Sequence, residues 1–148
     1  MPPRFLDPLE SRMDMLSTIR LIDTYYAAFN RRDWEGMLSC LADDVAHDLN
    51  QGPRETGREA FRAFLARMDA SYAEQLRDIH VMAGADGRRA AAEYVVHGTY
   101  KATDAGLPPA RGQGYVLPGG AFFDIRDGRI ARVSNYYNLQ HWLAQVGA

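Results

Sequence analysis

A tyrosine and an aspartate in the first third of the chain have residue types that suit proton-transfer chemistry. Tyr25 lies at the edge of the apolar face of the first predicted helix, and Asp48 ends the first predicted strand. The turn that follows is rich in Asn, Gln, Gly and Pro. A phenol donates hydrogen bonds and a carboxylate accepts protons, so the two groups suit acid–base work if they face one cavity. We expect any chemistry of this chain to begin here.

Helices and a short strand are predicted to position this pair. From about Asp14 the apolar residues recur three and four positions apart, at Ile19, Ile22, Tyr26 and Phe29. Asp33 is suited to cap a second helix over residues 34–41, and residues 45–49 predict a short strand. A third helix has the clearest pattern, because one face carries Phe61, Phe64, Leu65, Met68 and Tyr72. Its apolar face is expected to lie on a sheet.

The second half of the chain is predicted to supply that sheet. Segments rich in β-branched and aromatic residues cover 76–82, 89–101, 112–125 and 129–138, and a closing helix is predicted over 139–146. Asp-Gly pairs at 86–87 and 127–128 are typical of hairpins. Pro118, Gly119 and Gly120 predict a bulge or a bend that helps to curve one long strand. This order predicts an α+β fold, in which a cone-shaped, strongly curved, mostly antiparallel sheet wraps over three N-terminal helices and encloses a pocket.

The composition limits the domain count and the partners. The 148 residues suffice for one domain, placed at 14–148, and prolines at positions 2, 3 and 8 predict an extended or disordered arm over 1–13. A net charge of −2 without a Lys/Arg run argues against nucleic-acid and membrane-surface partners. The single cysteine, Cys40, predicts a buried thiol. No segment has the ~18 apolar residues of a membrane span, so we expect a cytoplasmic protein.

The order of the motifs resembles the nuclear transport factor two-like superfamily, and within it the SnoaL-like and ketosteroid isomerase-related proteins. The resemblance covers about residues 15–146. It rests on five motifs, which are Y-Y-A-A-F-N-x-x-D-W from Tyr25, A-D-D-V-A-H-D from Ala42, G-x-x-x-F from Gly57, H-G-T-Y with L-P-P-A-R-G from His97, and F-x-x-R-D-G-R-I from Phe123. The superfamily contains isomerases, dehydratases, epoxide hydrolases and non-catalytic binders. Its members commonly pair through the outer sheet face, which implies a homodimer.

The resemblance also implies roles for single residues. In the isomerases a carboxylate removes a proton next to a carbonyl, while a tyrosine and a protonated aspartic acid donate hydrogen bonds to the oxygen. Asp48 matches the base and Tyr25 matches the tyrosine. The place of the second acid falls at Gly119 or Gly120, which have no side chain. The amide of Asn135 on the last strand is a candidate for the missing donor.

The resemblance also implies which side chains of each strand point into the cavity. Substrate-binding residues are predicted to be Asn135, Tyr94, Val96, Phe64, Phe122, Tyr137 and Asn50. Alternation puts His47 opposite Asp48, and His97 opposite Tyr94, on the outer sheet face. The histidines show no ligand spacing, so no metal site is predicted, and proton transfer would need no cofactor.

Three functions remain open from the sequence. The first is a proton-transfer enzyme, either a ketosteroid isomerase-like isomerase, a SnoaL-like cyclase or a lyase, that acts on a hydrophobic carbonyl compound. The second is a non-catalytic protein that holds a hydrophobic ligand in the same cone. The third is a dimeric interaction module. The expected partners are a hydrophobic small molecule and a second copy of the chain, without nucleic acid or membrane.

Overall fold

The computed structural model describes residues 3, 5 and 7–147. Helix α1 (Pro8–Asn30) begins earlier than predicted, because the Asp7 side chain accepts hydrogen bonds from the amides of Leu9 and Glu10 and proline is favoured in the first helical turn. The predicted arm is therefore wrong for residues 8–13, which are helical. For residues 1, 2, 4 and 6 the prediction lies outside the described residues.

Two further helices complete the N-terminal layer. Helix α2 (Trp34–Ser39) is capped by Asp33, whose carboxylate accepts a hydrogen bond from the Gly36 amide at 2.9 Å. Helix α3 (Arg58–Ser71) buries Phe61 and Leu65. The three predicted N-terminal helices are thus confirmed. No helix among the described residues is long and apolar enough to cross a membrane.

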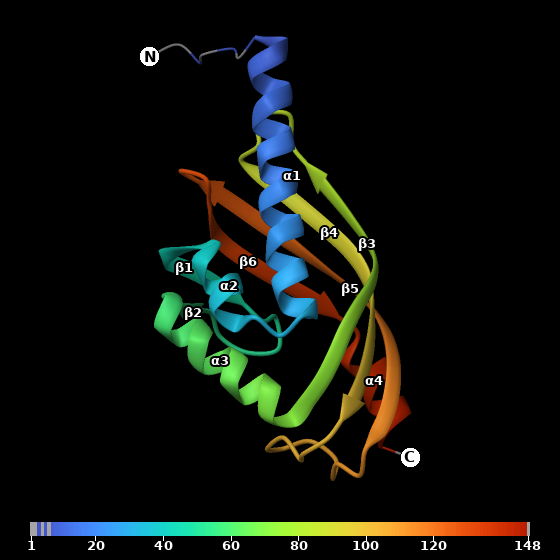
Figure 1. Ribbon diagram of the computed structural model, residues 1–148. Coiled ribbons are helices and arrows are strands. Elements are labelled where there is room, and N and C mark those ends of the chain that lie inside the picture. The colour runs from blue at the N-terminus through green and yellow to red at the C-terminus, as the bar shows by residue number, and fades with distance from the viewer. Residues whose placement is uncertain (1–2, 4, 6, 148) are drawn as a thin grey trace.

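A six-stranded mixed sheet forms the second layer. Its order is β2-β1-β6-β5-β4-β3, and only the β1–β6 pair is parallel. The strands are β1 (Leu41–Asp48), β2 (Glu55–Thr56), β3 (Tyr72–Ala83), β4 (Arg89–Tyr100), β5 (Gln113–Arg126) and β6 (Arg129–Tyr137). Helix α4 (Leu139–Val146) follows the last strand. Figure 1 shows the long strands curving around α1, α2 and α3, which confirms the predicted α+β architecture with a curved, mostly antiparallel sheet. The sheet is not closed.

The predicted bulge at Pro118–Gly120 is absent. The pairing of β4 with β5 runs without a shift from Arg89 opposite Asp124 to Tyr100 opposite Gln113. The glycine at 119 has a packing role instead, because a Cβ there would lie 2.7 Å from Cε2 of Tyr94. The lack of a side chain at Gly119 therefore leaves room for the Tyr94 ring.

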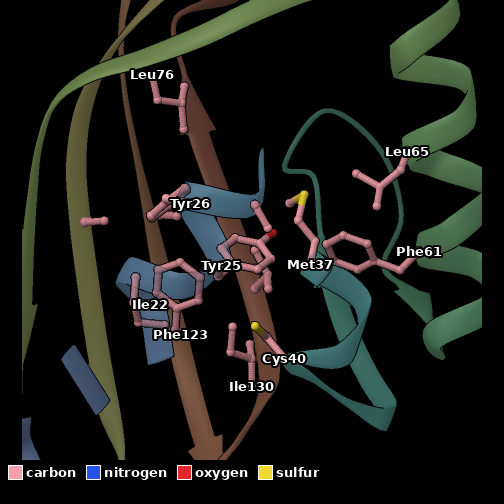
Figure 2. Packing of buried hydrophobic residues seen from close by; sticks show 14 of the residues in the cluster. Ile22, Tyr25, Tyr26, Met37, Cys40, Phe61, Leu65, Leu76, Phe123 and Ile130 are labelled. Carbon is pink, nitrogen blue, oxygen red and sulfur yellow. The ribbon is translucent and has the colours of Figure 1, made fainter. Parts of the chain in front are cut away.

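The core lies between the helices and the concave face of the sheet. Figure 2 shows Ile22, Tyr25 and Tyr26 of α1 packed close to Phe123 of β5. Tyr25 and Tyr26 each meet the Phe123 ring edge to face, at centroid distances of 5.9 and 6.1 Å. These contacts fix α1 against the middle of the sheet and leave space further along the concave face.

Candidate functional site

A cavity of about 340 Å³ lies between the concave face of the sheet and the helices. Its wall is mainly aromatic and aliphatic, and the aromatic members are Tyr25, Tyr26, Phe29, Trp34, Phe61, Phe64, Tyr72, Tyr94, Tyr115, Tyr137 and Trp142. The size and the apolar wall with a few polar groups are typical of small-molecule sites.

Tyr25 lines this cavity, where the sequence placed it. Its side chain is buried and packs edge to face against Tyr26, with ring centroids 5.2 Å apart. Burial raises the pKa of the Tyr25 phenol far above its ordinary value of 10.0, and the neighbouring Tyr94 adds to the rise. The phenol therefore stays protonated at neutral pH and can only act as a hydrogen-bonding group there.

Asp48 does not face the cavity, and the prediction that it shares one with Tyr25 is wrong. Its carboxylate accepts hydrogen bonds from Nε and Nη2 of Arg54 at 2.6 and 3.0 Å, and Arg132 lies 3.7 Å away. Hydrogen bonding from Arg54 is the main cause that lowers the pKa of Asp48. The reason is the alternation of side chains along β1. Val45 and His47 face the core, so Asp48, the next residue, points to the other face of the sheet.

His47 takes the inward position, against the prediction of an outer face. The side chain is 1% exposed, and its ring stacks on Phe61 with centroids 4.2 Å apart. Burial lowers the pKa of His47 to about 4, Asp48 opposes the shift, and Arg67 adds to it. At neutral pH the imidazole is therefore uncharged.

Asn135 also lines the cavity, and His47 holds its amide. Nδ2 of Asn135 lies 3.2 Å from Nε2 of His47. Asn50, predicted to touch substrate, is absent from the cavity wall, and its amide donates to the Asn135 carbonyl at 2.7 Å and to Oγ of Ser134 at 3.0 Å. Asn50 thus holds the β6 backbone at Asn135. It does not line the cavity as predicted, and it supports Asn135, which does.

The remaining predicted lining residues divide between the two faces of the sheet. Phe64, Tyr94, Val96 and Tyr137 line the cavity, while their part in substrate binding stays a prediction. Phe122 lies on the outer face, 47% exposed, and packs edge to face on Tyr136. Its neighbours Ala121 and Phe123 are buried, so alternation along β5 points Phe122 away from the cavity and that prediction is wrong.

The sequence reasoning missed Glu74, a carboxyl group in the cavity wall. Burial raises the pKa of Glu74 to about 7, although a hydrogen bond with Tyr115 acts to lower it. The predicted strand began at residue 76, whereas β3 starts at Tyr72. Alternation through Tyr72, Glu74 and Leu76, three residues of one face, is the signal that could have found it.

Other polar groups line the cavity near α1, α3 and the β4–β5 loop. Nη2 of Arg32 lies 3.7 Å from Asp69, and the Tyr72 hydroxyl donates to Asp104 at 2.8 Å. No group of three or more His, Cys, Asp or Glu side chains placed to hold a metal ion occurs in the part of the chain that the structure describes.

Comparisons with known proteins agree with this architecture. The SnoaL-like domain model matches residues 22–133, whereas no match was found among curated proteins. A proposed polyketide cyclase from Xanthomonas campestris pv. campestris is 65% identical over 89% of this chain and 98% of that chain, with a TM-score of 0.87. One from Pseudomonas putida KT2440 is 56% identical over 87% and 97%, with a TM-score of 0.86. A proposed ketosteroid isomerase from Kribbella flavida DSM 17836 is 25% identical over 84% and 80%, with a TM-score of 0.62.

Proposed function

Because the chain belongs to the SnoaL-like domain family, we propose that it is an enzyme of the proton-transfer type acting on a hydrophobic carbonyl compound. Isomerases, cyclases and many lyases share one step, the removal of a proton next to a carbonyl group. The observation that carries the proposal is the cavity of about 340 Å³, which combines an apolar wall with uncharged hydrogen-bonding groups. Such a step needs no cofactor.

The uncharged groups suit a neutral carbonyl oxygen. The Tyr25 phenol stays protonated, and the Asn135 amide is oriented by a neutral His47. Donors fixed in an apolar cavity stabilise charge that develops on such an oxygen more than water does, because they need no reorganisation. Asp48 has no part in this proposal, since it lies outside the cavity wall.

Filling the cavity is expected to weaken ligand binding by about tenfold or more, which corresponds to about 1.4 kcal/mol per factor of ten. Leu117→Trp adds a large ring at a buried position of the cavity wall. Unsaturated ketones and polyketide-like carbonyl compounds would be screened for binding by calorimetry and for turnover by absorbance. Ala66→Trp, at an exposed position of α3, is the control and should bind as the wild type does.

The outcomes of this screen separate the open functions. Turnover by the wild type that Leu117→Trp abolishes supports an enzyme that works in the cavity. Binding without turnover by any compound supports a non-catalytic ligand carrier of the same fold. Equal binding by the wild type and by a folded Leu117→Trp variant would contradict the cavity as the ligand site.

We also propose that two copies of the chain pair through the outer sheet face. Val116, Phe122 and Tyr136 expose 49%, 47% and 52% of their surface on this face, and apolar patches on soluble proteins mark interaction sites. Phe122→Asp is expected to convert a dimer into a monomer of 16.6 kDa, as measured by light scattering after gel filtration. Leu9→Asp, at an exposed apolar residue of α1, should leave the dimer intact. A monomeric wild type would contradict the proposal.

A further inference from the structure

We propose that Glu74, with Tyr115 held beside it over Gly98, takes and returns the substrate proton in this cavity. This inference deepens the proposed function and rests on it. It names a base on β3, an edge strand of the sheet, whereas the β1 strand that carries Asp48 lies next to the other edge.

The three residues form one row across three strands. Glu74 of β3 pairs with Gly98 of β4, and Gly98 pairs with Tyr115 of β5. Residues directly opposite each other in antiparallel strands share one face of the sheet, and Glu74 and Tyr115 both line the cavity. The row therefore brings a carboxyl and a phenol to the same wall.

The glycine makes this arrangement possible. A Cβ at position 98 would overlap Cζ of Tyr115 and would lie 2.5 Å from its hydroxyl oxygen. The Tyr115 ring thus lies across the backbone of β4 and brings its hydroxyl toward β3 and the Glu74 carboxyl, whose pKa it acts to lower. The Tyr115 side chain is 5% exposed, so packing holds the hydroxyl in place.

The surroundings of Glu74 suit a group that both accepts and donates a proton. Within the described residues, Glu74 forms no ion pair with Lys, Arg or His. Burial without a cation raises the pKa of Glu74 to about 7, so the carboxylate and the acid are both populated near neutral pH. A pKa near the working pH is the best compromise for general acid–base catalysis.

Tyrosines on three strands interact electrostatically with this carboxyl. Burial raises the pKa of Tyr94 to about 12, with the charge of Glu74 as the next cause, and Glu74 also contributes to the raised pKa values of Tyr115 and Tyr137. These phenols stay protonated and can donate hydrogen bonds. The other ionisable groups that line the cavity are Tyr25, Tyr26, Arg32, His47, Asp69, Tyr72 and Asp104.

The step balances without an added reactant. The Glu74 carboxylate takes a proton from the carbon next to the carbonyl, and the electron pair of the broken C–H bond forms a carbon–carbon double bond. The carbonyl oxygen gains the negative charge, and a phenol of the tyrosine group donates a hydrogen bond to it. In a β,γ-unsaturated ketone the product is a dienolate, and return of the proton to its γ carbon moves the double bond into conjugation, completes an isomerisation and restores the carboxylate.

Two other groups are less suited to this role. Asp48 is held by arginines outside the cavity wall, and its lowered pKa makes it a weaker base. His47 has a pKa of about 4, and its Nδ1 atom is buried without a hydrogen-bond partner in the described part of the chain. Among these three groups, only Glu74 combines access to the cavity with a pKa near 7.

The test follows the exchange of ketone protons with solvent deuterium. The probe is 2-tetralone, a hydrophobic ketone whose protons next to the carbonyl are acidic, and proton NMR in D₂O measures their loss. The wild type should accelerate exchange, and Glu74→Gln should lower the accelerated rate by about 10²–10⁴-fold. Asp48→Asn makes the same carboxyl-to-amide change outside the cavity and should exchange at the wild-type rate. Binding of 2-tetralone by Glu74→Gln, seen as NMR line broadening, shows that its cavity is intact.

The pH dependence separates catalysis from a structural role. The wild-type rate should rise with pH and level off above about 7, because the carboxylate is the active form. Tyr115→Phe should move this midpoint upward, because its hydrogen bond lowers the pKa of Glu74. Fast exchange by Glu74→Gln would overturn the assignment of Glu74 and leave the proposed function standing. A wild type that binds the ketone without exchanging its protons would overturn both.

Discussion

Replacement of Glu74 by Gln is expected to raise the free energy of unfolding by about 3 kcal/mol at pH 8 and to leave it nearly unchanged at pH 4. Burial raises the pKa of Glu74 from 4.5 to about 7 in the folded protein. Below pH 4.5 the carboxyl is protonated in both states, so its full contribution to stability is present there. That contribution is lost as the pH rises to about 7, and each unit of pKa difference corresponds to about 1.4 kcal/mol.

Thermal unfolding at several pH values would measure this effect. A gain of about 3 kcal/mol corresponds to a rise in Tm of roughly 6–12 °C for a domain near this size. Asp23→Asn, at an exposed position of α1, is the control and should change stability by less than about 0.5 kcal/mol at either pH. Equal stability of Glu74→Gln and the wild type at pH 8 would show that the Glu74 carboxyl is solvated. A gain in stability combined with a loss of exchange would show that the protein keeps a costly buried charge for its reaction.

Substitution of Gly98 by Ala is expected to destabilise the protein by about 1–3 kcal/mol. The added methyl group would overlap the ring of Tyr115, which is enclosed by its surroundings and has little room to move. The displaced phenol would also leave Glu74, so the rate of ketone exchange should fall together with stability. Urea unfolding monitored by circular dichroism gives the free energy, and an unchanged m-value would show that only stability has changed.

Two further variants test the origin of this effect. Gly114→Ala in β5 adds the same methyl group where its nearest neighbour would be the Gly98 carbonyl oxygen at 3.9 Å, and little change is expected. Tyr115→Leu in the Gly98→Ala background should recover part of the loss, because a shorter side chain removes the overlap. A Gly98→Ala protein as stable as the wild type would contradict the close packing of the Tyr115 ring on Gly98.

Helices, strands and hairpins were predictable because short-range patterns determine them. The closing helix was predicted at 139–146 and is observed at Leu139–Val146. The apolar spacing that predicted the third helix corresponds to α3, where Phe61 and Leu65 are buried. The Asp-Gly turns join β3 to β4 and β5 to β6. In each case residues a few positions apart carry the information, so the α+β class follows from the sequence.

Which side chains of a strand point into the cavity was less predictable, because a shift of one residue exchanges the two faces of the strand. Asp48 and Phe122 were assigned to the cavity and lie on the outer face, while His47 was assigned outward and lies inside. The burial of Val45 and His47 on β1 determines the orientation of Asp48, because alternation along the strand leaves Asp48 on the opposite face. Tyr25 lines the cavity as expected, because the broad apolar face of a helix tolerates a small error in register, and its catalytic role stays a prediction.

The sequence by itself determined a helical layer, a set of long strands and a cavity wall rich in aromatic residues. Only the tertiary structure decided which polar groups enter that cavity. Glu74, Gly98 and Tyr115 lie on three different strands, and pairing of those strands brings the three into one row. The raised pKa of Glu74 depends on its burial in the cavity wall, and that burial is a property of the assembled wall. Local sequence patterns carry no record of such long-range contacts, so the carboxyl at the centre of the proposed chemistry emerges only from the fold.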